Sequence, residues 1–137
     1  MSEPFRVTRR VEFYETDMAG IMHFSNFFRY MEFAEVEFLR AKGLSVAWLE
    51  TNGERIGFPR VSAACDYRRP VRFEDVVEIA VKIARVGRKS VTYEFDFSCR
   101  GEEVARGKVT AAYCVKKADG TLEAIDIPTD MRSKLET

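Results

Sequence analysis

The chain has 137 residues, of which 46% are hydrophobic and 32% are charged, with 22 basic and 22 acidic side chains and no formal net charge. A chain of this length is expected to form one domain, residues 1–137, whose core needs no disulfide or metal to hold it. The balanced charge lacks the basic excess that is typical of nucleic-acid-binding proteins, so we predict no nucleic-acid partner.

Cysteine spacing and hydropathy predict the compartment. Cys65, Cys99 and Cys114 are odd in number and far apart, which fits neither a disulfide framework nor a paired-cysteine metal site. No segment approaches the roughly 20 apolar residues of a membrane span, and Met1–Val11 lacks the apolar run of a signal peptide. We therefore predict a soluble, cytoplasmic protein with free thiols and no membrane insertion.

The N-terminal third predicts a strand, a loop and the main helix. Residues 5–13 alternate imperfectly between apolar and charged side chains, as in a strand, and residues 15–25 contain loop-tolerant types. Residues 26–42 predict a long helix, which the side chain of Ser25 or Asn26 can cap. Gly43 follows where a left-handed C-terminal residue belongs. The apolar stripe of this helix consists of Phe27, Met31, Ala34, Phe38 and Ala41.

The remainder of the chain predicts mainly antiparallel strands. Residues 45–50 are expected to form one further short helix, and residues 51–57 are rich in turn-forming types. A change of apolar face near Gly107 indicates a bulge or a strand buried on both faces. A closing helix is expected from Pro128 to Leu135. The predicted strands are residues 60–69, 75–86, 90–100 and 103–116. These elements predict an α+β domain in which an antiparallel sheet wraps around the long helix.

The polar residues exclude several kinds of catalytic centre. His23 is the single histidine, so a multi-histidine metal site is excluded. A Ser-His-Asp triad would have to use His23, and Ser25 is too close along the chain to face it well. The chain has no phosphate-binding glycine loop and no paired CxxC motif. We therefore expect no metal and no redox cofactor.

Asp17 lies in a glycine-containing loop just before the long helix. On the residues alone it either makes a turn or takes part in chemistry. The free N–H groups and the positive dipole end of a helix can polarise a carbonyl and stabilise a developing oxyanion. A nearby carboxylate can attack that carbonyl or activate water. Together these parts suggest acyl transfer to water.

A second candidate is the basic hairpin tip at residues 87–90. Arg88 and Lys89 either remain solvated or hold phosphate, because arginine is a bidentate phosphate donor and lysine a point charge. The aromatic residues near Asp17 leave a similar choice between helix core and an aryl pocket, and helical spacing favours the core. They are Tyr14, Phe24, Phe27, Phe28 and Tyr30.

The segment from Val11 to Glu32, VEFYETDMAGIMHFSNFFRYME, closely resembles the signature of the 4-hydroxybenzoyl-CoA thioesterase family, which has the hotdog fold. The resemblance continues almost to the end of the chain, through Tyr67-Arg68-Arg69-Pro70, Asp75, Gly87-Arg88-Lys89-Ser90 and Ile127-Pro128. It implies hydrolysis of an acyl-CoA thioester to a free acid and CoA.

The resemblance also implies roles for residues in the signature. It places the catalytic carboxylate, nucleophile or general base, at Asp17 and the polarising backbone N–H at Phe24. Glu32 matches an acidic position near the acyl pocket. Many bacterial members of the family carry a histidine at the position of Phe24, often after another at the position of His23. This chain keeps only His23. A side-chain role at Phe24 is thereby lost, and His23 either orients the water or thioester or has a packing role.

The family's binding mode implies further residues and a partner. Arg88, Lys89 and Ser90 match the hairpin that contacts CoA phosphates. The fold implies a dimer with sheets joined edge to edge, often paired again into a tetramer, with active sites between subunits. Val61 and Ser62 of a second copy are then expected to line the pocket.

Two other functions are compatible with the same fold, because a fold does not fix a function. One is a non-catalytic module that binds acyl-CoA or an acyl carrier. The other is a dehydratase acting on a hydroxyacyl thioester, which would pair Asp17 with His23. The nature of the acyl group is not specified by the sequence.

Overall fold

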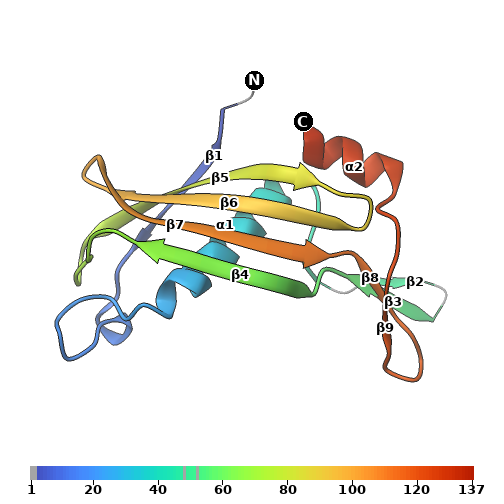
Figure 1. The fold of residues 1–137 in the computed structure, drawn as a ribbon, viewed down its shortest axis with the longest axis horizontal. Helices are drawn as coiled ribbons and strands as arrows, with labels where there is room; N and C mark the ends of the chain where they lie inside the picture. The colour runs from blue at the N-terminus through green and yellow to red at the C-terminus, as the bar shows by residue number, and fades with distance from the viewer. Residues whose placement is uncertain (1–2, 48, 52) are drawn as a thin grey trace.

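The computed structural model describes residues 3–47, 49–51 and 53–137. One long helix and two antiparallel sheets make up most of it (Figure 1). The elements are β1 (Phe5–Arg10), the 3-10 turn η1 (Phe13–Glu15), α1 (Asn26–Ala41), β2 (Leu49–Thr51), β3 (Glu54–Gly57), β4 (Arg60–Tyr67), β5 (Val76–Val86), β6 (Ser90–Cys99), β7 (Glu102–Ala112), β8 (Cys114–Lys116), β9 (Leu122–Ala124) and α2 (Thr129–Glu136).

The main sheet has five antiparallel strands in the order β1-β5-β6-β7-β4. Helix α1 lies behind this sheet and crosses its strands (Figure 1). The predicted α+β architecture of an antiparallel sheet around a long helix is therefore confirmed. Within the described ranges, no helix is both long and apolar enough to cross a membrane.

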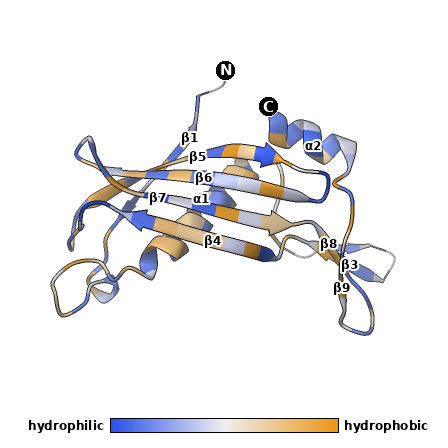
Figure 2. Ribbon diagram, in the orientation of Figure 1, coloured by the Kyte–Doolittle hydropathy of each residue, from blue (hydrophilic) through white to orange (hydrophobic). Residues whose placement is uncertain are grey.

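The core lies between α1 and the concave face of the main sheet. Bands of hydrophobic and hydrophilic residues alternate along β5 to β7, so each strand turns one apolar row toward the helix (Figure 2). Met31 and Leu39 of α1 are fully buried, as are Val81, Tyr93 and Phe97 of the strands. The helix ends as expected: Gly43 has a φ of +75°, and the N–H of Leu44 reaches back to the carbonyl of Leu39 at 2.7 Å.

A second, four-stranded sheet in the order β2-β3-β8-β9 overturns two local expectations. The short helix expected over residues 45–50 is wrong, because Leu49 and Glu50 belong to β2; Trp48 lies outside the described residues. The segment 51–57, expected to be turn-rich, contains β3; Asn52 also lies outside the described residues. Strand β3 pairs with β8, about sixty residues further along the chain. Local propensity does not reveal such a distant partner.

The strand expected over 103–116 is divided at Tyr113. The N–H of Tyr113 donates to the carbonyl of Lys89 at 2.8 Å, and the chain then enters β8 of the second sheet. Register shifts between the pairs Phe97–Ala105 and Ser98–Glu103, which leaves Val104 unpaired as a bulge. The bulge predicted near Gly107 thus occurs three residues earlier.

Gly107 itself has a packing role. It lies in the middle of β7, and a methyl group built there would overlap the sulfur of Met31 on α1. Met31 is fully buried. The glycine therefore lets the helix approach the sheet closely.

We predict that Gly107→Ala lowers the free energy of unfolding by about 1–3 kcal/mol, because it overpacks a filled core. Urea denaturation followed by circular dichroism would measure the change. In a Met31→Ala background the same substitution should cost clearly less, because the shortened side chain removes the overlap. Equal costs in both backgrounds would contradict the packing role assigned to Gly107.

Candidate active site

Asp17 lies on a tight loop between η1 and α1. A bridge between Thr16 and Met22 closes the loop, and Gly20 completes the turn with a φ of +78°. The Asp17 Oδ1 accepts the N–H of Ala19 at 2.8 Å. The side chain is exposed, and no described residue pairs with Oδ2. Asp17 therefore makes the expected turn contact and still presents one carboxylate oxygen to solvent.

The backbone just after this loop turns into α1. The N–H of Asn26 donates to the carbonyl of His23 at 3.0 Å, and that of Phe27 to the carbonyl of Phe24 at 3.2 Å. The N–H of Ser25 reaches the His23 Nδ1 at 3.3 Å. The N–H of Phe24 has no acceptor among the described residues. It lies beside the positive end of the helix dipole, where a donor can stabilise an oxyanion.

His23 is held by its neighbours. Its Nδ1 lies 2.8 Å from the Oγ of Ser25, and its ring stacks on that of Phe24 with 4.6 Å between centroids. Ser25 occupies the N-cap position but makes no capping bond, because its hydroxyl pairs with His23. Asn26 does not cap either, since its amide donates to the carbonyl of Glu15 at 2.9 Å. The capping expected from either side chain is therefore wrong.

The aromatic residues near the loop divide between core and surface. Phe27 and Tyr30 are buried in the core, whereas Phe24 is 60% exposed. The hydroxyl of Tyr67, at the end of β4, donates to the carbonyl of Phe24 at 3.3 Å. Its ring contacts Phe24 and Phe27 edge to face, with centroid distances of 6.2 and 5.2 Å. Asp17 thus lies on a loop whose far end carries exposed aromatic surface.

Glu15 is a polar residue of this region that our sequence analysis missed. It is buried, and its carboxylate accepts the hydroxyl of Tyr30 at 2.7 Å and the N–H of Glu12 at 2.8 Å. Burial and the hydrogen bond to Glu15 raise the pKa of Tyr30 well above its ordinary value, so this phenol stays protonated. The spacing of Glu12 and Glu15, which matches a capping box, was the available signal.

The basic hairpin at residues 87–90 connects β5 to β6 and is fixed by the C-terminal segment. Arg132 of α2 donates to the carbonyls of Val86 at 3.1 Å and Gly87 at 2.7 Å. The Arg88 Nε lies 3.0 Å from the Oδ1 of Asp126, and both side chains are exposed. Lys89 is half-buried and pairs with no acid among the described residues. Arg132 therefore holds the backbone of the hairpin, and a carboxylate already pairs with one of its cations.

The loop between η1 and α1 and the hairpin between β5 and β6 lie at opposite ends of the main sheet (Figure 1). The Asp17 loop lies at the beginning of β5, where the N–H of Val11 donates to the carbonyl of Asp75 at 2.8 Å. The hairpin follows the end of β5, eleven residues later, which corresponds to about 36 Å of extended strand. One copy of the chain therefore does not bring Asp17 together with Arg88, Lys89 and Ser90.

Val61 and Ser62 lie on β4, the exposed edge strand of the main sheet. Val61 is 64% exposed. Tyr67 ends β4 beside Phe24, whereas Arg60 begins it beside Ala111 of β7, near the other end of the sheet. Val61 and Ser62 are thus remote from the Asp17 loop of their own chain.

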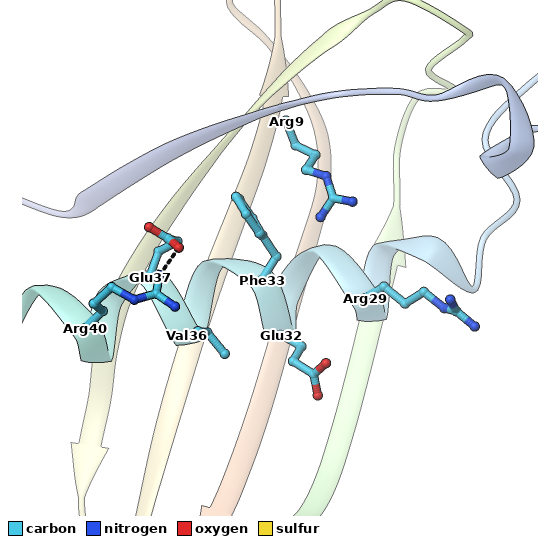
Figure 3. Close-up of a pocket in the computed structure, with 7 residues that line it drawn as sticks. All are labelled: Arg9, Arg29, Glu32, Phe33, Val36, Glu37 and Arg40. Atoms are coloured by element: carbon cyan, nitrogen blue, oxygen red, sulfur yellow. Dashed lines mark hydrogen bonds and ion pairs between the residues drawn. The ribbon is translucent and has the colours of Figure 1, made fainter. Parts of the chain in front are cut away.

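Glu32 lies on the outer side of α1, in a shallow hollow of about 480 Å³ (Figure 3). The hollow also contains Arg9 from β1, together with Arg29, Phe33, Val36, Glu37 and Arg40 from the helix. Figure 3 shows Glu32 projecting to one side of α1, while Phe33 and Arg9 approach each other on the other. Glu32 does not enter the core between helix and sheet.

Comparisons with known proteins agree on one family. A model of the thioesterase-like superfamily matches residues 11–135. A 1,4-dihydroxy-2-naphthoyl-CoA hydrolase of Synechococcus sp. (strain RCC307) is 31% identical over 112 residues, covering 80% of this chain and 85% of the relative. A solved gentisyl-coenzyme A thioesterase superposes with a TM-score of 0.82 at 29% identity, covering 96% of this chain and 99% of the other.

A further solved structure supports the fold alone. It is an aspartate-to-asparagine mutant of 4-hydroxybenzoyl CoA thioesterase in complex with 4-hydroxybenzoyl CoA. It superposes with a TM-score of 0.83 at 22% identity and covers 98% of this chain and 99% of the other.

Proposed function

Because the chain belongs to the thioesterase-like superfamily and hydrolyses an acyl-CoA thioester to free acid and CoA, we propose that Asp17 and the N–H of Phe24 act on the thioester. The resemblance to the hotdog-fold 4-hydroxybenzoyl-CoA thioesterase family that the sequence indicated is thereby confirmed. The observation that carries the proposal is the loop itself, which presents a carboxylate oxygen of Asp17 and, seven positions later, the N–H of Phe24, neither of which has a partner among the described residues.

In the proposed reaction, the N–H of Phe24 donates to the thioester carbonyl oxygen. As the carbonyl carbon becomes tetrahedral, this oxygen gains negative charge, which the N–H and the positive end of α1 stabilise. Asp17 either attacks the carbon or removes a proton from the water that does so. The C–S bond breaks, and CoA leaves as the thiolate that takes up a proton. If water attacked, the free acid forms directly; if Asp17 attacked, the acyl group remains on its carboxylate as an anhydride, which water then cleaves to release the acid and restore Asp17. These steps require water and protein groups only, and we propose no metal or redox cofactor.

We further propose that the active unit is a dimer joined through β4. This strand is an eight-residue edge with exposed side chains, and such edges readily pair with another strand. Antiparallel pairing about a two-fold axis would place the Tyr67 end of one copy beside the Arg60 end of the other. That arrangement brings the partner's Val61 and Ser62 toward the Asp17 loop, and it turns the partner's basic hairpin toward the same side.

The basic hairpin is proposed to bind CoA phosphates. Arg88 would exchange Asp126 for a phosphate, Lys89 would add a charge, and Ser90 a hydroxyl. Arg132 holds the backbone of the hairpin, and this supports the proposal. A backbone that is already held in place loses less conformational entropy when it binds phosphate.

The acyl group is proposed to be aromatic. The rings of Phe24 and Tyr67 are exposed next to the proposed oxyanion donor, and both can contact a flat aryl group. The naphthoyl and gentisyl thioesters named for two similar proteins are aromatic acyl-CoAs. Glu32 keeps a proposed role near the acyl group only in an assembly in which a second copy covers its hollow.

A panel of thioesters monitored for free thiol tests this function. We expect gentisyl-CoA, 4-hydroxybenzoyl-CoA or 1,4-dihydroxy-2-naphthoyl-CoA to be hydrolysed at least about tenfold faster, as kcat/KM, than acetyl-CoA and palmitoyl-CoA; this corresponds to about 1.4 kcal/mol of differential binding. Faster turnover of an aliphatic thioester would refute the aromatic class alone.

Two other outcomes of that panel would contradict thioester hydrolysis itself. Binding of every thioester without thiol release would indicate a non-catalytic acyl-CoA or acyl-carrier binding module. An enoyl product from a hydroxyacyl thioester, detected by mass spectrometry, would indicate a dehydratase.

We also propose a cytoplasmic location, which the three free cysteines support.

A further inference from the structure

Two charged side chains are buried within the described ranges, Glu15 at 6% exposure and Glu35 at 1%. A buried carboxylate is costly unless it is paired and hydrogen-bonded. Glu35 pairs with Arg60 at 2.7 Å, halfway along α1 and away from the Asp17 loop. Glu15 lies two residues before Asp17. Its burial therefore coincides with the proposed active site and calls for a role there.

The carboxylate of Glu15 connects three elements. Its Oε1 accepts the N–H of Glu12 in the turn before the loop and the hydroxyl of Tyr30 on α1. Its Oε2 lies 3.8 Å from the guanidinium of Arg9 on β1. Arg9 in turn lies over the rings of Tyr30 and Phe33, 5.0 and 4.8 Å from their centroids. Figure 3 shows Arg9 descending from β1 toward Phe33 on the helix.

The backbone of Glu15 connects the two sides of the loop. Its carbonyl accepts the N–H of His23 at 2.9 Å and the side-chain amide of Asn26 at 2.9 Å. The chain leaves Glu15 toward Asp17 and returns at His23, directly before Phe24. One residue therefore holds the entry of the loop, its exit and the first residue of α1.

We propose that Glu15 is a positioning residue that fixes Asp17 relative to the N–H of Phe24. The inference rests on the proposed roles of those two groups. A carboxylate and an oxyanion donor on one loop act together only if the loop is held in place, since a misplacement of about 1 Å can cost about 10²-fold in rate. The buried carboxylate supplies that restraint by tying the base of the loop to β1 and α1.

Glu15→Gln and Glu15→Ala test this proposal in the full-length protein. The amide of Gln can still accept from Tyr30 but loses the charge that faces Arg9; Ala loses every side-chain contact. We expect kcat of the folded enzyme to fall about three- to tenfold for Gln, and by a similar factor for Tyr30→Phe, and about 10²-fold for Ala, with KM within about threefold of wild type. A smaller loss of kcat for Gln than for Ala would reflect the hydrogen-bond acceptor that Gln keeps for the hydroxyl of Tyr30.

Glu35→Gln is the matched control, because it removes the charge of the other buried carboxylate. It should lower the melting temperature while leaving kcat per folded molecule within about twofold. If Glu15→Ala also leaves kcat within twofold while Asp17→Asn abolishes turnover, the positioning role is wrong and the proposed function stands. If Asp17→Asn leaves turnover unchanged, the proposed function fails with it. A Glu15→Ala protein that does not fold would leave the Gln variant and a Tyr30→Phe variant to decide, and wild-type kcat in both would refute the proposal.

Discussion

Replacing Asp17 with Asn is expected to lower kcat by at least about 10²-fold, the lower end for removing a catalytic base. The substitution keeps an acceptor oxygen for the N–H of Ala19, so the turn that shapes the loop is retained. It removes the charge that, in the proposed reaction, attacks the thioester or activates water. Thiol release from the best substrate of the panel, measured at saturation, gives kcat directly.

Asp119 offers a control with the same local geometry. Its Oδ1 accepts the N–H of Thr121 at 2.9 Å in a turn between β8 and β9, so it makes the same kind of aspartate turn as Asp17. Asp119→Asn should leave kcat within about twofold. Wild-type turnover in the Asp17 variant, or an equal loss in both variants, would remove Asp17 from the reaction. With Asp17 confirmed, a single turnover in H₂¹⁸O that labels the enzyme's carboxylate would identify the nucleophilic route.

A mixture of two impaired variants, one altered in the basic hairpin and one at Asp17, is expected to recover activity. Arg88→Ala/Lys89→Ala should raise KM for acyl-CoA at least about tenfold, because each charge-assisted contact contributes about 1.5–3 kcal/mol. In a dimer whose sites combine one copy's Asp17 with the other copy's hairpin, a mixed dimer with an Asp17→Asn subunit has one intact site. Random exchange should then restore about a quarter of wild-type activity at a substrate concentration near the wild-type KM.

Each variant alone, carried through the same unfolding and refolding, is the control for that mixture. Activity equal to the sum of the two separate variants would show that each site lies within one subunit, or that the chain acts as a monomer. Sedimentation of the mixture distinguishes these outcomes. A dimer without recovery would contradict the composite site while leaving self-association intact.

The sequence predicted those elements whose signals are local. Apolar spacing in α1 and alternation in β5 and β6 placed these elements within a residue or two, because each element buries one face against the other. The second sheet was missed because β3 pairs with β8, far along the chain, and β2 joins that sheet only through β3. The prediction of helix capping was wrong for a similar reason. Capping rules do not include the partners that the side chains have in the fold, which are His23 for Ser25 and the carbonyl of Glu15 for Asn26.

The candidate site was predicted in its parts but not in its geometry. The motif named Asp17 and Phe24, and the structure places both on one loop before α1. It named Arg88 and Lys89 as well, but motifs carry no information on which end of a sheet a residue occupies. Glu15 was missed because a glutamate in a segment of polar and loop-forming residues is expected to be exposed, and only the fold buries it beside Arg9.

The bulge at Val104 also limits how far two copies can pair. Its carbonyl accepts the N–H groups of both Arg68 and Arg69, at 2.7 and 3.1 Å, so the chain leaves the ladder directly after Tyr67. The exposed edge of β4 therefore ends at Tyr67, and a second strand can align with at most the eight residues from Arg60 to Tyr67. A slip of two residues would leave a quarter of that length without a partner. The bulge in β7 thus fixes one end of the edge that a second strand could pair with, and the register shift between Arg60 and Ser62 makes β4 irregular near its other end.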